Sequence, residues 1–134
     1  MYRRDLLTAE IQKLGLALAR ILGLKEQGKL DEADNGLNEI FENEFGILFS
    51  DLIASDMENF AVFLTDKNFP SEKLDMFSQF VYLKFNPVLI DETSLSLAKK
   101  LQLIYQTLEI KHHVVNMINL GRQKTVEQYL NNNS

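Results

Sequence analysis

The 134-residue chain contains no cysteine, no tryptophan and only two prolines. Without cysteine it cannot form disulfides, use a thiolate as a nucleophile or hold a metal through a thiolate. A reducing compartment is compatible with this composition. The chain also lacks any apolar run that approaches the roughly 18 residues of a membrane-spanning helix, so we expect no membrane span. What remains is the ordinary composition of a globular protein, with 46% hydrophobic and 25% charged residues.

Acidic residues outnumber basic ones in the first half of the chain but not in the second. Residues 1–67 have a formal charge of −6, whereas residues 68–134 have a charge of +1. Binding to nucleic acid needs a concentrated basic face, so the acidic first half argues against a nucleic-acid partner. We interpret it as a solvated acidic surface. Attraction between the two halves and steering of a basic partner are the alternatives.

Two helical patterns meet in residues 23–41, which read GLKEQGKLDEADNGLNEIF. Apolar positions such as Leu18 and Ile21 lead up to a Gly-Lys turn, and positions such as Leu37 and Phe41 lead away from it at helical spacing. Helices joined by so short a turn must lie antiparallel, so we predict an αα-hairpin here.

The spacing of apolar residues predicts about six helices and no strand along the whole chain. The predicted helices cover residues 4–27, 30–44 (with 31 as an alternative start), 51–66 (with 55 as an alternative start), 70–85, 93–109 and 111–130, with the last break near residues 109–112. Residues 47–49 are either a short turn of helix or an apolar link, residues 68–70 form a turn, and the candidate N-caps of the fifth helix are Asp91, Thr93 and Ser94. The break before the last helix has an alternative, in which one long helix continues to Leu120 and turns at Gly121. The helices pair as three hairpins, 4–44, 51–86 and 93–131, which we expect to stack within a single domain of residues 1–134.

The first hairpin resembles a tetratricopeptide-type unit at three positions. Gly28 stands at the turn, Ala33 where the paired helices approach closely, and Leu37 at the large apolar position four residues later. The stretches RRDLLTAEIQKL and ALARILGLKEQGKLDEA also look like an uncharacterised bacterial family of small, tetratricopeptide-like helical proteins. The resemblance implies an all-α fold of stacked antiparallel helical hairpins, a right-handed array, in a bacterial cytoplasm. It carries over no catalytic residue.

Two patterns resemble parts of known metal sites, but the residues of neither pattern are arranged to bind a metal. Residues 31–42, DEADNGLNEIFE, nearly spell a calcium-binding loop, but Ala33 stands where an oxygen ligand is needed. Their apolar residues are spaced as a helical face, so we interpret the segment as helix. His112 and His113 are adjacent and would point about 100° apart on a helix, which suits a surface or capping role better than chelation. We expect no catalytic motif, no metal and no cofactor.

All nine phenylalanines lie between positions 41 and 85, and most should form the core of the central hairpin. The segment 74–85 is apolar nearly all round, so it is either central in the fold or covered by a partner. We therefore name Phe77, Phe80 and Tyr82 as candidate residues for self-association in a homodimer.

The leading hypothesis for function is a non-enzymatic protein–protein interaction module, in which the concave face of a hairpin stack holds an unknown protein or peptide. Candidate groove residues lie on the first helices of the hairpins: Arg20, Lys25, Asn59, Lys100 and Tyr105.

Two alternatives stay open. One is a small-ligand-binding or enzymatic protein with its site in a cleft lined by Phe60, Phe77 and Phe80. The other is a self-assembling structural subunit, which would bury a large apolar symmetric interface.

Overall fold

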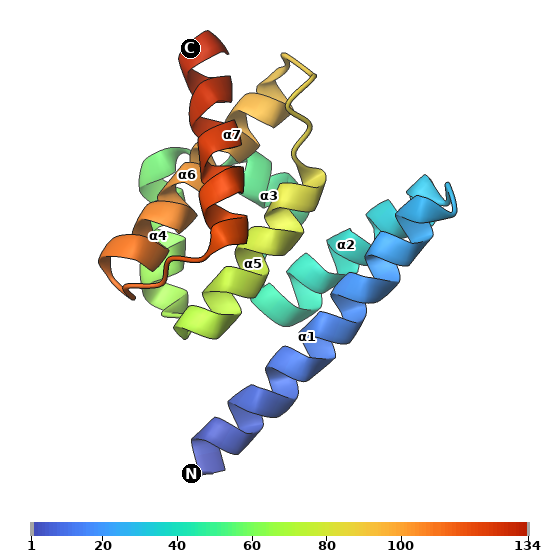
Figure 1. Cartoon of the computed structure of the whole chain (residues 1–134), viewed down its shortest axis with the longest axis vertical. Coiled ribbons are helices and arrows are strands. Elements are labelled where there is room, and N and C mark those ends of the chain that lie inside the picture. The colour runs from blue at the N-terminus through green and yellow to red at the C-terminus, as the bar shows by residue number, and fades with distance from the viewer. Residues whose placement is uncertain (1, 134) are drawn as a thin grey trace. The chain divides into compact units, whose positions relative to one another are not determined.

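The chain is all-α over the part that the structure, a computed structural model, describes, which is residues 2–133 (Figure 1). These residues form seven helices and no strand: α1 (Tyr2–Glu26), α2 (Leu30–Phe45), α3 (Phe49–Ala54), α4 (Met57–Lys67), α5 (Ser71–Lys84), α6 (Glu92–Ile110) and α7 (Met117–Asn133). The all-α prediction is confirmed. The helices gather into two compact units, Met1–Phe49 and Ser50–Ser134, and each is described by itself.

The region predicted as one helix over residues 51–66 contains two, which is why the described chain has seven helices instead of six. Ser55 separates them, and its hydroxyl donates to the Leu52 carbonyl at 3.2 Å. Asp56 then caps α4, because its carboxylate accepts the backbone N–H of Asn59 at 2.7 Å. A new cap of this kind starts a new helix, and α4 begins two residues after the alternative predicted start at residue 55.

The break predicted before the last helix is confirmed. Helix α6 ends at Ile110 and α7 begins at Met117, so the alternative of one helix reaching Leu120 is wrong. Asp91, one of the predicted N-caps, accepts the backbone N–H of Ser94 at 2.8 Å and starts α6.

In the first unit, α1 and α2 form the predicted antiparallel hairpin (Figure 1). Gly28 has a φ of 76° at the turn, a left-handed conformation that glycine adopts without steric cost. An ion pair of 2.8 Å between Lys13 Nζ and Glu44 Oε1 joins the two helices far from the turn. The buried residues of this unit are Leu14, Ile21, Ala33, Leu37, Phe41 and Phe45.

The calcium-like segment 31–42 lies inside α2 and is helical, as predicted. Its glycine, Gly36, lets α1 approach: a Cβ at this position would lie 2.6 Å from Cδ1 of Ile21, which is fully buried. The glycine that would make the tight bend of an ion-binding loop therefore makes a close helix–helix contact instead.

In the second unit, α6 is the central helix and packs against α4, α5 and α7 (Figure 1). Its buried residues occupy several faces: Ser94, Leu97, Ala98, Lys100, Leu101, Ile104, Tyr105 and Leu108. Among the helices of residues 2–133, none combines the length and the apolarity needed to cross a bilayer.

Aromatic rings join α4 to α5 across the predicted turn at residues 68–70. The ring of Phe77 on α5 lies 6.5 Å from that of Phe60, 6.2 Å from that of Phe63 and 5.9 Å from that of Phe69. Such tilted arrangements suit the ring quadrupoles. The rings pack the second unit's interior, and Phe60 and Phe77 are both fully buried.

Helices α4 and α6 run parallel to each other. One hydrogen bond joins the start of α4 to the middle of α6, and another joins the ends of both helices, in nearly the same register. Lys100 Nζ donates to the carbonyl of Ser55 just before α4, with 45 residues between the partners. Lys111 Nζ donates to Oδ1 of Asn68 just after α4, at 3.3 Å and with 43 residues between them. Antiparallel helices could not keep the offset this constant.

We predict that replacing Gly36 by Ala destabilises the protein, although Ala is the better helix former. In Gly15→Ala, at an exposed site on α1 with no atom within 4 Å of the new Cβ, the free energy of unfolding should rise by about 0.5–1 kcal/mol. In Gly36→Ala the contact with Ile21 should outweigh that gain and cost about 1–3 kcal/mol, as in other overpacked cores. Urea unfolding followed by circular dichroism measures both. Equal stabilisation by the two substitutions would contradict the close contact.

Candidate functional site

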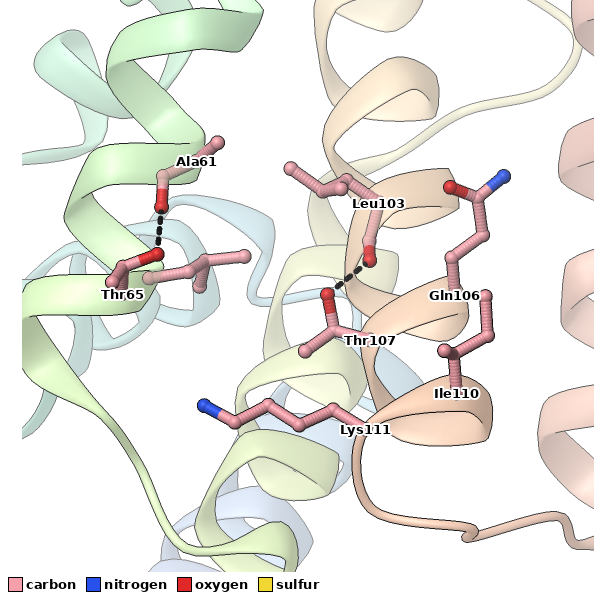
Figure 2. Close-up of a pocket in the computed structure, with 8 residues that line it drawn as sticks. Ala61, Thr65, Leu103, Gln106, Thr107, Ile110 and Lys111 are labelled. Carbon is pink, nitrogen blue, oxygen red and sulfur yellow. Dashed lines mark hydrogen bonds between the residues drawn. The ribbon is translucent and has the colours of Figure 1, made fainter.

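A groove of about 370 Å³ lies between the parallel helices α4 and α6 (Figure 2). Its lining residues are Ala61, Leu64, Thr65, Leu103, Gln106, Thr107, Ile110 and Lys111. Leu64 is buried and Leu103 half-buried, whereas Thr65, Gln106 and Ile110 are exposed at the rim. The volume is at the lower end of the range typical of ligand pockets, about 300–1,000 Å³.

The two threonines make the groove more apolar than its composition indicates. Thr65 Oγ1 donates to the carbonyl of Ala61 at 2.9 Å, and Thr107 Oγ1 donates to the carbonyl of Leu103 at 2.8 Å (Figure 2). Each hydroxyl thus bonds to the backbone one turn earlier in its own helix, a pattern open to threonine in helices. Each side chain then offers a ligand its methyl group and the acceptor lone pairs of its hydroxyl oxygen, but no free donor.

Lys111 is the one charged residue among those that line the groove. Its side chain reaches from the end of α6 towards α4, where its ammonium donates to Oδ1 of Asn68 at 3.3 Å (Figure 2). The residue is exposed, so the ammonium also faces solvent. The groove therefore has apolar walls and one positive charge at the end where both helices finish.

The stop of α6 at this end is made by the backbone of His113. This residue has a φ of 57°, in the left-handed region, and the N–H of Val114 donates back to the carbonyl of Leu108 at 2.8 Å. This hydrogen bond joins residues six positions apart, and the left-handed conformation of His113 turns the chain away from the helix axis. The capping role predicted for the histidine pair is thus found at His113. Burial lowers the pKa of the neighbouring His112, and the charge of Lys111 lowers it further.

The structure offers no clear metal centre. Within residues 2–133, no three side chains of His, Cys, Asp or Glu lie close enough together to hold a metal ion.

Lys100 lies at the opposite end of the α4–α6 pair and is only 3% exposed. Its ammonium donates to the carbonyls of Ile53 (3.3 Å) and Ser55 and to Oγ of Ser96 (2.7 Å). The two carbonyls belong to the end of α3, where the helix dipole favours a cation. Burial lowers the pKa of Lys100. Because its three donors are all used, we assign Lys100 to the attachment of α3 and not to a surface site.

We predict that Lys100→Met destabilises the protein by about 2–3 kcal/mol, because hydrogen bonds to charged groups contribute about 1.5–3 kcal/mol and the α3 carbonyls would lose their partner. Lys99→Met is the matched control, since Lys99 is the exposed neighbour and its loss should change stability by less than about 0.5 kcal/mol. Equal effects of the two substitutions in urea unfolding would show that the ammonium does not hold α3.

Tyr105 lies in a second polar cluster, where α5, α6 and α7 meet. Asn119 Nδ2 donates to Oδ1 of Asp75 at 2.7 Å, and the guanidinium carbon of Arg122 lies 4.8 Å from the centre of the Tyr82 ring. Tyr105 is 2% exposed, and its buried hydroxyl has no hydrogen-bond partner among the described residues. Burial raises the pKa of Tyr105 well above its ordinary value, although the charge of Arg122 partly opposes this.

We predict that Tyr105→Phe stabilises the protein by about 1 kcal/mol near neutral pH, because a buried hydroxyl without a partner carries its desolvation cost alone. The gain should grow as the pH rises above about 10, where the unfolded tyrosine releases a proton that the folded protein retains. Urea unfolding at pH 7 and at about pH 11 measures both effects. A loss of stability at pH 7 would show that the hydroxyl forms a bond in solution.

The five groove residues predicted from the sequence do not form the groove between α4 and α6. Lys100 and Tyr105 are buried, so neither side chain reaches the surface. Asn59 is exposed on α4. Arg20 is exposed and Lys25 is half-buried, and both belong to the first unit. The sequence could not tell which face of α6 is covered by the neighbouring helices.

The residues predicted for self-association are also buried or half-buried. Phe77 and Phe80 are fully buried, so they have no surface to offer a second copy, and Tyr82 is half-buried beneath Arg122. Phe60 is fully buried too, and none of these phenylalanines lines the groove. The residues that do line it were missed because threonine and glutamine give no apolar signal. The spacing of Leu103, Thr107 and Lys111 by four residues is the pattern that could have found them.

Comparisons of the chain with protein-family models, with curated proteins and with solved structures found no match.

Proposed function

We propose that this protein is a non-enzymatic interaction module that binds a protein or peptide segment in the groove between α4 and α6. The observation that carries the proposal is the groove itself: about 370 Å³ of space with apolar walls on the surface of the second unit. A surface of this kind marks a binding site more often than a solvated face.

The arrangement of the second unit supports a tetratricopeptide-like stack, which is part of the proposal. Helix α6 packs against α4, α5 and α7, that is, against both helices of the predicted preceding hairpin and against its own predicted partner. In such a stack the first helices of successive hairpins lie side by side and line the binding face. The groove lies between two such helices. A bacterial cytoplasmic setting, implied by the sequence resemblance, is also part of the proposal.

Binding without catalysis fits the polar groups of the groove. The hydroxyls of Thr65 and Thr107 donate to backbone carbonyls, so no neighbouring base activates them as nucleophiles. Lys111 is exposed to solvent, and none of the other residues that line the groove is an acid or a base. We therefore place the groove's function in recognition.

We predict that peptides selected from a random library on the full chain lose about tenfold or more in affinity when Thr107 is replaced by Arg, because the longer side chain fills the groove. Thr125→Arg is the matched control: Thr125 on α7 donates to the carbonyl of Gly121 in the same way but does not line the groove. Fluorescence anisotropy gives the affinities, and thermal unfolding confirms that both variants are folded. Selected peptides that bind both variants equally well would contradict the proposal.

A further inference from the structure

The groove has a polarity set by its two helices. Because α4 and α6 are parallel, both have their carboxyl ends at Asn68 and Lys111, and both dipoles place partial negative charge there. A third helix lying in the groove would be favoured in the antiparallel direction, with its amino end and partial positive charge at this end.

The positive charge of Lys111 at the same end indicates which side chain a bound segment should place there. Lys111 carries the only charge of the lining, and one hydrogen bond to Asn68 uses one of the three donors of its ammonium. An acidic side chain on the bound segment could pair with the remaining donors. In the first turn of a helix, an acidic residue also interacts favourably with the helix's own dipole. One acidic residue there would thus pair with Lys111 and also suit the dipole of its own helix.

The walls of the groove favour a helix over an extended chain. Both walls are helices whose backbone groups are paired internally, and the threonine hydroxyls are bonded to their own helices. An extended peptide would find few partners for its backbone N–H and C=O groups against such walls, and unpaired polar groups cost free energy when buried. A helix pairs these groups itself and offers apolar side chains at three- and four-residue spacing.

We propose that the segment bound in this groove is an amphipathic helix that runs antiparallel to α4 and α6 and carries an acidic residue in its first turn, beside Lys111. This inference rests on the proposed function and names the class of its partner.

The test uses three 18-residue peptides of one composition, each held helical by the same lactam bridge on its polar face. The first has leucines in one stripe and two Glu residues in its first turn. The second has the same stripe with both Glu residues in the last turn, and the third has the leucines scattered. Anisotropy titrations are made with the full chain and with Thr107→Arg, Lys111→Met and Lys111→Glu.

We expect the first peptide to bind about three- to tenfold more tightly than the second, as one exposed ion pair and the dipoles allow. The preference should shrink in Lys111→Met and reverse in Lys111→Glu. The third peptide should bind weakly, and Thr107→Arg should weaken the first two alike.

Equal binding of the first two peptides, or tighter binding of the second, would overturn the inference while the loss in Thr107→Arg still supported the proposed function. If no peptide binds, or if Thr107→Arg changes nothing, both the inference and the groove's proposed function fail. Two further results would overturn the inference by naming another occupant. One is binding of the dye anilinonaphthalene sulfonate at the groove with no peptide able to displace it. The other is self-association of the full chain that Thr107→Arg abolishes.

Discussion

The burial of α6 on three sides is the constraint on which the second unit depends. Leucine and isoleucine positions cover several faces of this helix, so it must be surrounded, and α4, α5 and α7 each cover part of it. The remaining strip of α6, from Leu103 to Lys111, faces α4 across a gap that small and branched side chains do not fill. The groove thus lies along the part of α6 that the packing of α4, α5 and α7 leaves uncovered.

The two ends of the α4–α6 pair are held by lysines with different environments. At one end the buried ammonium of Lys100 is enclosed by backbone carbonyls and a serine hydroxyl, where it fixes the end of α3. At the other end the ammonium of Lys111 is exposed and has a single long hydrogen bond. Lys100 therefore has a structural role, because all its donors are used within the protein. Lys111 keeps donors that face solvent.

Much of the fold could be predicted from the sequence because its signals are local. The left-handed stop at Gly28, the cap at Asp91 and the break after residue 110 follow from turn and capping chemistry that a few neighbouring residues determine. The helical reading of the calcium-like segment followed from its apolar spacing in the same way. The division of residues 49–67 into α3 and α4 was missed, because it depends on Asp56 and on a lysine 44 positions away.

The groove could not be predicted, since it depends on which face of α6 each neighbour covers. Lys100 and Tyr105 carry polar atoms that suggest an exposed surface, yet tertiary contacts bury both. Thr65 and Thr107 have the opposite character, because hydrogen bonds within their own helices hide the hydroxyls that make them look polar. Residue type alone therefore indicated the wrong side of the helix.

The bonds that hide those hydroxyls have a consequence for folding. Their acceptors lie one turn away in the same helix, so they can form as soon as each helix forms and before α4 and α6 meet. The apolar strips are consequently present on the separate helices of a partly folded chain, where nothing yet holds them at their final spacing. A newly made chain would therefore expose these apolar strips to other chains before α4 and α6 have packed together.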